Sequence, residues 1–296
     1  MRKFGVFVAF LLIAFLAVNA LYLFALSKVD AEFRKTDESV NFTDESFEIL
    51  VLGNSTALDG VNTQMLSDSV GTAYNFSLAG SSIESNYIQL EHYLARNNRP
   101  EFVLFFLSSC HINYNREYVV NPIIENYYGL WRFELEELPL FKFRWLFIEN
   151  FKKILSSERR KSSVVAGQLI LERSVADGTV FENSSIANCT TDYQSKGYTF
   201  LKHIAQQCAD QGIKFLAFEM PCWSRKQNNC DDVYVGFGPD VKFKVVNLNR
   251  RDVAGPLLNS RADWLSENHL NYAGSVKLFE AIKAAILEEE ESGNFQ

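Results

Sequence analysis

The stretch Phe47-Glu-Ile-Leu-Val-Leu-Gly-Asn-Ser55 decides the fold of this chain. Its apolar residues form a short continuous run, which is typical of a strand buried on both faces of a parallel sheet. Gly53 follows the run and lets the backbone turn sharply. Ser55 then stands at the predicted carboxyl edge of the sheet, where ligand sites of α/β folds lie. The opening therefore predicts a parallel α/β core together with a candidate site residue.

Strands and amphipathic helices alternate along the rest of the chain. Further strands are predicted at Ala73–Phe76, Phe102–Leu107, Ile213–Phe218 and Val241–Leu248. Helices with apolar residues three and four positions apart are predicted at 82–96, 198–212 and 273–291. This order predicts a three-layer α/β/α (flavodoxin-like) sandwich with a central parallel sheet covered by helices on both faces.

The N-terminus carries a candidate membrane anchor. Residues 4–26 form an apolar run that is interrupted by the polar Asn19, and about 20 such residues suffice to span a bilayer. Arg2 and Lys3 precede the run and acidic residues follow it, so the positive-inside rule predicts a cytoplasmic N-terminus and an extracytoplasmic domain. A cleaved signal peptide is the alternative, because Val18-Asn19-Ala20 has the spacing of a cleavage site.

Two segments show no regular α/β pattern: the one between anchor and domain, and one within the domain. The polar, acidic residues 27–45 predict a linker, and residues 46–291 form the predicted α/β domain. Residues 114–190 loosen the α/β pattern and are rich in aromatic and basic side chains, so we expect a mostly helical insertion. This insertion could cover the sheet, lie on the membrane surface or dock a partner. Its aromatic residues Tyr127, Tyr128, Trp131 and Trp145 could also stack on sugar rings.

Charge and cysteine content narrow the function classes. The formal net charge of −7 argues against a nucleic-acid binder, which would present a basic face. The five cysteines show no CxxC spacing, so neither a zinc site nor any other metal or cofactor is expected. Outside the cytoplasm Cys222 and Cys230 are the best local pair for a disulfide, and Cys189 with Cys208 is a second possibility. A thiol enzyme that uses Cys110 with His111 is disfavoured, because adjacent residues point in different directions.

Two polar residues far apart in the sequence form the candidate catalytic pair. Ser55 by itself fits a helix cap as well as a nucleophile. His269, in Asn268-His-Leu-Asn-Tyr-Ala-Gly274, precedes the last amphipathic helix, and from there a neutral imidazole can reach the edge of the first strand. An early serine with a late histidine therefore predicts nucleophilic catalysis.

Three blocks of the sequence resemble those of the SGNH (GDSL-like) hydrolase superfamily. Ile49-Leu-Val-Leu-Gly-Asn-Ser55 is similar to its first block, Asn75-Phe-Ser-Leu-Ala-Gly80 to its second, and His269-Leu-Asn-Tyr-Ala-Gly274 to its last. In style the chain resembles the anchored members that accompany membrane-bound O-acyltransferases and the proteins of D-alanyl-lipoteichoic acid transfer. The resemblance implies that Ser55 is the nucleophile, that His269 is the base, and that the N–H groups of Ser55 and Gly80 line an oxyanion hole.

The sequence departs from this pattern at two positions. The family's aspartate three residues before the histidine is Ser266 here, so Glu267 or Asp263 is expected to orient His269, unless a carbonyl group does so. The third block, whose asparagine donates to the oxyanion, is replaced by Ser108-Ser-Cys-His-Ile-Asn113. Asn113, Ser109 or His111 could supply that donor.

The resemblance implies a serine esterase or O-acyltransferase. Its substrate would be an acyl group, acetyl above all, on a cell-envelope or extracellular polysaccharide, with an acyl-serine formed on Ser55. A membrane-bound O-acyltransferase is the implied partner, and the N-terminal helix provides the contact with the membrane. The alternative is a catalytically degenerate homologue that binds glycan or an assembly partner.

Overall fold

The structure, a computed structural model, describes residues 2–108, 120–130, 134–146, 163–174, 198–223, 230–237, 241–258 and 261–292. The chain forms two compact units. One consists of Met1–Asn41 and Pro122–Ser162, and the other of Phe42–Asn121 and Ser163–Gln296. Each unit has a hydrophobic core of its own.

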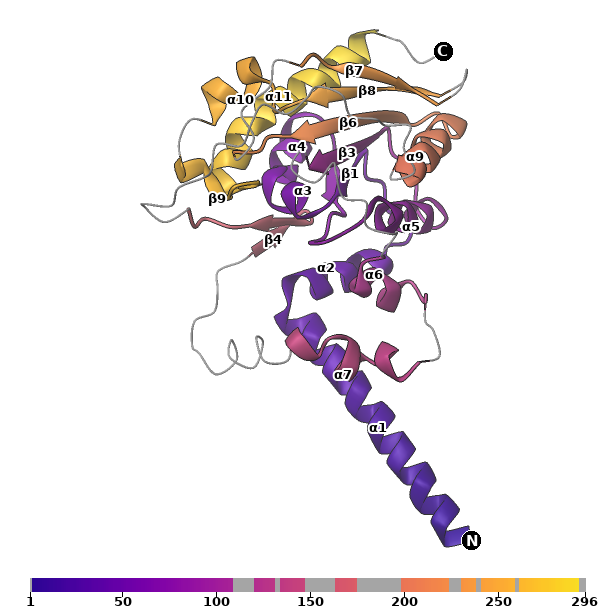
Figure 1. Ribbon diagram of the computed structural model, residues 1–296. Coiled ribbons are helices and arrows are strands. Elements are labelled where there is room, and N and C mark those ends of the chain that lie inside the picture. Colours follow the sequence, from indigo (N-terminus) through magenta and orange to yellow (C-terminus); the bar gives the residue numbers. More distant parts are fainter. Residues whose placement is uncertain are drawn as a thin grey trace. The chain divides into compact units, whose positions relative to one another are not determined.

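A six-stranded sheet forms the centre of the larger unit, with strand order β2-β1-β3-β6-β8-β7 (Figure 1). The strands are β1 (Ile49–Gly53), β2 (Ala73–Asn75), β3 (Phe102–Ser108), β6 (Lys214–Met220), β7 (Val233–Gly236) and β8 (Lys242–Asn247). Neighbouring strands are parallel except for β7, which runs antiparallel to β8 at one edge. The predicted α/β fold with a central, mostly parallel sheet is confirmed.

Helices cover both faces of this sheet, because alternate side chains of each strand point to opposite faces. Ile49 and Val51 belong to the core beneath the first set of helices, which are α3 (Ser55–Gly60), α4 (Thr63–Ser69), α10 (Arg251–Leu257) and α11 (Tyr272–Ser292). Leu50 and Leu52 belong to the core beneath the second set, which are α5 (Ile83–Leu94) and α9 (Thr199–Asp210). Every residue of β1 is buried, as its continuous apolar run predicts.

The predicted strands and helices of the sandwich agree with the structure to within a few residues. Two short hairpins were not predicted. They are β4 (Ser163–Val165) with β5 (Gln168–Ile170), and β9 (Trp264–Ser266) with β10 (His269–Leu270). The β4–β5 hairpin belongs to the segment expected to be mostly helical, and it packs on the α/β core. The carbonyl of Ala166 at its turn accepts the N–H of Asn75 (3.0 Å), and Gln168 Nε2 donates to the carbonyl of Asp59 (3.2 Å).

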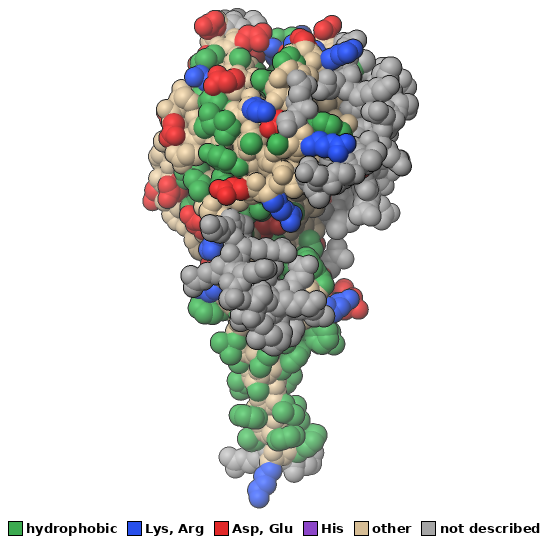
Figure 2. Space-filling model, turned by 90° about the vertical axis from the view of Figure 1, so that its left-hand side faces the viewer, with side chains coloured by type: hydrophobic (Ala, Val, Ile, Leu, Met, Phe, Trp, Pro, Cys, Tyr) green, Lys and Arg blue, Asp and Glu red, His purple; other side chains and the backbone are tan. Residues whose placement is uncertain are grey.

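The smaller unit contains the N-terminal helix. Its elements are α1 (Arg2–Val29), α2 (Ala31–Val40), α6 (Pro122–Tyr127), the 3-10 helix η2 (Leu135–Glu137) and α7 (Pro139–Lys142). Helix α1 is long and apolar enough over Lys3–Val29 to cross a membrane, and hydrophobic side chains line its exposed length (Figure 2). The segment expected as a linker holds α2, which Asp30 caps by accepting the N–H groups of Glu32 and Phe33. This amphipathic helix is stabilised because Phe33 packs against apolar side chains of α1 and of the residues after α7.

Candidate active site

The first part of the candidate site is the sharp turn between β1 and α3. A Cβ at Gly53 would lie 2.7 Å from the Cβ of Ala57 and 2.9 Å from the carbonyl oxygen of Phe106, so only glycine fits there. Asn86 of α5 holds this turn, because its Oδ1 accepts the Gly53 N–H at 2.8 Å. Asn54 then caps α3 through Thr56, whose backbone N–H and Oγ1 lie 3.0 Å and 2.8 Å from the Asn54 Oδ1.

Ser55 is the first residue of α3, and its side chain faces His269. The Nε2 of His269 lies 2.8 Å from the Oγ of Ser55, although the two residues are more than two hundred positions apart in sequence. Both residues are half-buried, so solvent can reach the pair. The structure thus brings together the two residues that sequence analysis singled out as nucleophile and base, at the distance expected for a nucleophile and its base.

The other ring nitrogen of His269 contacts Ser266. The β9–β10 hairpin pairs Ser266 with His269 across the turn Glu267-Asn268, and the Ser266 Oγ lies 2.8 Å from His269 Nδ1. The Ser266 hydroxyl in turn donates to Asn268 Oδ1 at 3.1 Å. A serine hydroxyl has one proton, so the oxygen of Ser266 faces Nδ1 as an acceptor. We therefore assign the proton of neutral His269 to Nδ1, which leaves Nε2 with a lone pair toward Ser55.

Of the two acidic residues expected to orient His269, Asp263 has another side-chain partner, and Glu267 is bonded through its backbone. The carboxylate of Asp263 is buried, and its Oδ2 forms an ion pair with Lys277 Nζ at 2.8 Å. Glu267 lies in the hairpin turn, where its carbonyl accepts the N–H of Trp223 at 2.7 Å. The contact expected from Glu267 or Asp263 at Nδ1 is made by Ser266. Sequence analysis identified Ser266 only as the position of a missing acid, and it did not identify Asn268.

The remaining residues of the last sequence block form the start of α11. Asn271 caps the helix, since its Oδ1 accepts the N–H of Gly274 at 3.0 Å. The backbone N–H of Asn271 donates to the carbonyl of Asp263, also at 3.0 Å. A Cβ at Gly274 would collide with this same Asp263 carbonyl, so glycine is required for the close approach. These contacts fix the hairpin that carries His269 against the first turn of α11.

Backbone N–H groups near Ser55 are candidate oxyanion donors. The N–H of Ala57 is taken by the carbonyl of Asn54 (3.1 Å), whereas none of the described residues accepts the N–H of Ser55. Gly80 lies in an exposed turn after β2, the parallel neighbour of β1, with a left-handed φ of 71°. The buried Asn75 supports this region through a bond from its Nδ2 to the Ala57 carbonyl at 2.9 Å. Asn113, Ser109 and His111, expected as a third donor, lie outside the described residues.

The segment that begins at Cys222 touches the histidine hairpin. Cys222 and Cys230 are disulfide-bonded, whereas Cys208 is a free, buried thiol, which excludes the alternative pairing of Cys208. The Cys222 N–H donates to Asn249 Oδ1 at 3.1 Å, and the next residue, Trp223, is the one bonded to the Glu267 carbonyl. The Trp223 ring also packs edge-on against Trp264 of β9, with ring centroids 5.7 Å apart. Burial raises the pKa of the Cys208 thiol, which keeps it protonated and unreactive.

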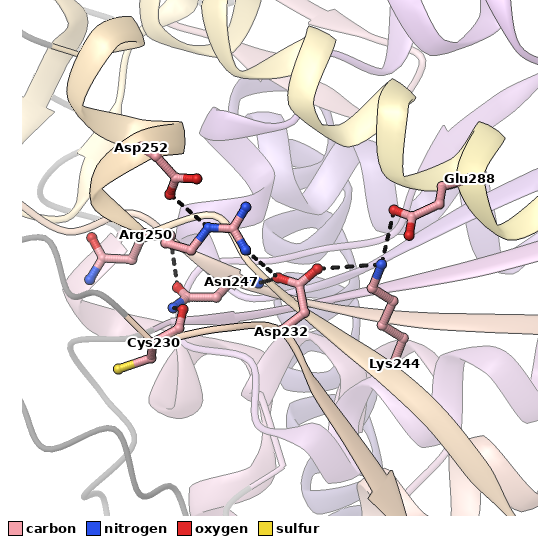
Figure 3. Close-up of polar contacts among 8 residues, drawn as sticks. Cys230, Asp232, Lys244, Asn247, Arg250, Asp252 and Glu288 are labelled. Carbon is pink, nitrogen blue, oxygen red and sulfur yellow. Dashed lines mark hydrogen bonds and ion pairs between the residues drawn. The ribbon is translucent and has the colours of Figure 1, made fainter.

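An ion-pair network holds the segment after Cys230 on the sheet edge (Figure 3). Lys244 of β8 has only 7% of its side chain exposed and pairs with Asp232 (3.3 Å) and Glu288 (3.0 Å). Burial alone would lower the pKa of Lys244, but the bonds and charges of Glu288 and Asp232 raise it above its usual value. Asn247 fastens the backbone, since its Nδ2 donates to the Cys230 carbonyl at 2.8 Å. The disulfide-bonded Cys230 is thus attached to β8, and the disulfide-bonded Cys222 is next to the residue that contacts the histidine hairpin.

Within the described ranges, no group of three or more His, Cys, Asp or Glu side chains is arranged as a metal site.

The aromatic residues expected to stack on sugar rings differ in exposure and in the contacts they make. Tyr127 packs edge-on against Phe33, with ring centroids 6.1 Å apart, whereas Trp145 is 61% exposed. Trp131, Cys110 and Cys189 lie outside the described residues.

Comparisons with known proteins add a fold likeness. No protein-family model matches the sequence, and neither does any curated protein. The chain is similar to a solved structure described as "a putative platelet activating factor from Streptococcus pneumonia", with 12% identical residues and a TM-score of 0.41. The likeness covers 91% of this chain and 97% of the other. The function of this chain is therefore argued from the residues of its own site.

Proposed function

We propose that the larger unit catalyses acyl-ester chemistry, as a serine esterase or O-acyltransferase, with Ser55 as nucleophile and His269 as general base. The observation that carries this proposal is the 2.8 Å separation of Ser55 Oγ and His269 Nε2 at the carboxyl edge of the sheet. Sites of open α/β sheets lie at this edge. The resemblance of the three sequence blocks to SGNH hydrolases supports the same assignment.

The proposed first half-reaction forms an acyl-serine. Ser55 Oγ attacks the carbonyl carbon of the ester while its proton passes to His269 Nε2. The negative charge on the former carbonyl oxygen is stabilised by N–H donors, for which Ser55 and Gly80 are the candidates. Collapse of this intermediate breaks the ester bond, and the leaving alcohol takes the proton back from Nε2. In the second half-reaction water or a sugar hydroxyl gives its proton to His269 and attacks the acyl-serine. The bond between the acyl carbon and Ser55 Oγ then breaks, and Oγ takes the proton back from His269 Nε2.

Ser266 and Asn268 are proposed to position the base rather than to react. The bond from His269 Nδ1 to Ser266 Oγ fixes the ring and its tautomer, which is one part of what an acid does in a serine triad. A neutral hydroxyl stabilises the imidazolium less than a carboxylate does, by about 1 kcal/mol. We therefore expect a working but slower enzyme than a Ser-His-Asp triad would give.

The substrate class and the location are proposed from the resemblance and from the anchor. Acyl groups on a cell-envelope or extracellular polysaccharide, acetyl groups above all, fit the anchored SGNH proteins that the sequence blocks resemble. The basic residues Arg2 and Lys3 at the start of α1, together with the acidic Asp30 and Glu32 after it, favour an extracytoplasmic domain. A membrane-bound O-acyltransferase is the proposed donor of the acyl group, in which case the acceptor is a sugar rather than water.

A catalytically degenerate glycan-binding or assembly protein is the alternative function. One observation favours it, since Ser266 stands where the related enzymes have an acid. It requires the Ser55–His269 pair to be unreactive. The two functions therefore differ in the nucleophilicity of one side chain.

The deciding experiment measures that nucleophilicity in the full chain, purified in detergent. A fluorophosphonate probe reacts with activated serines, and p-nitrophenyl acetate reports turnover by release of nitrophenolate. We expect one label on Ser55, identified by peptide mass spectrometry, and loss of label and turnover in Ser55→Ala. Ser69→Ala is the matched control, because Ser69 is an exposed serine at the end of α4, before β2 begins. A folded protein that takes no label, yet binds an acetylated polysaccharide, would establish the binding module instead.

A further inference from the structure

Helix α7 of the smaller unit is hydrogen-bonded to Asn19, the polar residue that interrupts the apolar run 4–26 of α1. The N–H of Leu140 donates to Asn19 Oδ1 at 3.0 Å, and Asn19 Nδ2 donates to the carbonyl of Phe15, also at 3.0 Å. Asn19 is only 3% exposed, whereas its neighbour Val18 is 50% exposed and Leu21 is 67% exposed. The polar side chain is therefore satisfied within the protein, while the surface around it stays apolar.

A second set of contacts joins the residues after α7 to α1. Tyr22 donates its hydroxyl proton to the carbonyl of Phe143 at 2.8 Å. Phe143 is buried against Leu26 and Leu146, and its ring meets that of Phe33 edge-on, with centroids 4.8 Å apart. Helix α7 and the residues that follow it are thus packed firmly on the C-terminal third of α1.

The position of these contacts along α1 corresponds to a membrane boundary. At 1.5 Å per residue, Asn19 and Tyr22 lie about 22 and 27 Å from Phe4 along the helix axis. The hydrocarbon core of a bilayer is about 30 Å thick. If the basic Lys3 marks one face of the bilayer, the contact at Asn19 lies about 8 Å and that at Tyr22 about 3 Å inside the hydrocarbon of the opposite leaflet, so the segment reaches from this leaflet toward its headgroups.

The outward side of this segment suits that boundary. Leu135, Phe141 and Trp145 are large apolar residues that are 62%, 38% and 61% exposed. The rings of Phe141 and Phe15 pack with centroids 6.5 Å apart, so the exposed surface of α7 continues the apolar surface of α1. Tryptophan is enriched at membrane interfaces, where its amphipathic ring sits at headgroup level.

The one lysine of α7 is neutralised inside the unit. Lys142 is 11% exposed and pairs with Glu125 (2.6 Å) and with Glu137 (2.7 Å). A charge in a medium of low polarity is costly unless it is paired and hydrogen-bonded, and Lys142 meets both conditions. Lys142 therefore adds no unpaired ammonium group to this surface, and the exposed charged residues of the same stretch are Glu134, Glu136 and Arg144.

We propose that the described residues 134–146, which we name the interfacial segment, insert their apolar side chains into the headgroup boundary of a phospholipid bilayer beside α1. Lipid is the occupant favoured over a protein partner, because the exposed apolar surface is continuous with that of the membrane-spanning helix. The segment would then fix the depth and rotation of α1 in addition to the attachment that α1 provides. This inference concerns the smaller unit and does not depend on catalysis at Ser55.

Bromolipid quenching of Trp145 tests the proposal. The full chain is reconstituted in phosphatidylcholine–phosphatidylglycerol vesicles whose acyl chains carry bromine close to the headgroup or near the bilayer centre. Part of the tryptophan emission should be quenched by bromolipid. We expect this quenching to be about twofold stronger with the shallow bromines than with the deep ones, as for an interfacial tryptophan. This part should decrease in Trp145→Phe, leaving any contribution of Trp131 in the same unit, and should persist in the control Trp223→Phe, since Trp223 belongs to the larger unit.

Equal quenching of the wild-type protein and Trp145→Phe would overturn the proposal, because Trp145 would then face water or a protein partner. Quenching by the deep bromines alone would also overturn it. Leu135→Trp provides a second probe, since Leu135 is equally exposed, and it should add a shallow-quenched emission to the wild-type signal. The fluorophosphonate labelling of Ser55 should stay unchanged in Trp145→Phe and in Leu135→Trp, so failure of this inference and failure of the proposed function are distinguished.

Discussion

His269 Nδ1 lies 2.8 Å from the hydroxyl oxygen of Ser266, at the position where the resemblance to SGNH hydrolases places an aspartate. The pairing follows from the β9–β10 hairpin, whose two-residue turn sets these residues opposite one another. A residue three positions before the histidine is therefore close to its ring whether or not it is acidic. In this chain a hydroxyl occupies the position of the acid that the resemblance implies, and it lies at hydrogen-bond distance from the ring.

Ser266→Ala should lower kcat for p-nitrophenyl acetate about fivefold, because loss of one hydrogen bond of about 1 kcal/mol frees the ring of His269. Ser266→Thr keeps the hydroxyl and should restore most of the rate. Ser266→Asp adds a carboxylate, which favours the protonated imidazole, so the acid limb of the pH–rate profile should move to higher pH. An unchanged kcat and pH profile in Ser266→Ala would show that Ser266 does not position His269.

Asn54→Ala should destabilise the protein by about 1 kcal/mol in urea unfolding, because the cap of α3 is lost. It should also slow the labelling of Ser55, whose N–H and Oγ belong to the first turn of that helix. Asn54→Asp keeps an oxygen that can accept from Thr56 and should behave like the wild type. Full stability of Asn54→Ala would mean that the cap contributes little at this turn.

Reduction of the disulfide-bonded cysteines should slow the labelling of Ser55 about two- to tenfold, since misplaced catalytic groups lose rate steeply. The physical reason is the bond from Trp223, next to Cys222, to the Glu267 carbonyl in the histidine hairpin. The double variant Cys222→Ser with Cys230→Ser should already be slow and should not respond to dithiothreitol. If dithiothreitol does not change the labelling rate of the wild-type protein, the disulfide-bonded cysteines do not influence the position of the catalytic pair.

Lys244→Ala should destabilise the protein by about 1 to 3 kcal/mol, because the partly buried Asp232 loses its pair with Lys244 and keeps the longer one with Arg250 (3.5 Å). Lys242→Ala is the matched control, since Lys242 is exposed on the same strand, and its effect should stay within about 0.5 kcal/mol. The pKa of Lys244 is raised in the folded state, so its stabilisation is complete below the unfolded value of about 10.4 and is lost as the pH rises further. Urea unfolding at pH 7 and pH 11 measures both effects, and equal losses at the two pH values would contradict this account.

Much of the sandwich could be predicted from the sequence, because burial on both faces leaves a local pattern. The run from Ile49 to Leu52 and the helical period of α11 identify their elements without knowledge of their partners. The edge strand β7 was missed because exposed residues such as Tyr234 interrupt its apolar pattern. Helix α2 was missed because its acidic and basic residues obscure the buried Phe33 and Thr36.

The sequence by itself determined the α/β core, the apolar helix and the two residues, Ser55 and His269, that the ends of that core bring together. Each of these depends on local spacing or on the order of parallel strands, which a linear pattern records. Only the tertiary structure decided that Ser266 contacts His269, that Asp263 pairs with Lys277, and that α7 packs on Asn19. Such pairings depend on which side chains face one another across a hairpin or between helices, and the free energy of a polar contact is set by distance and burial that no single residue encodes.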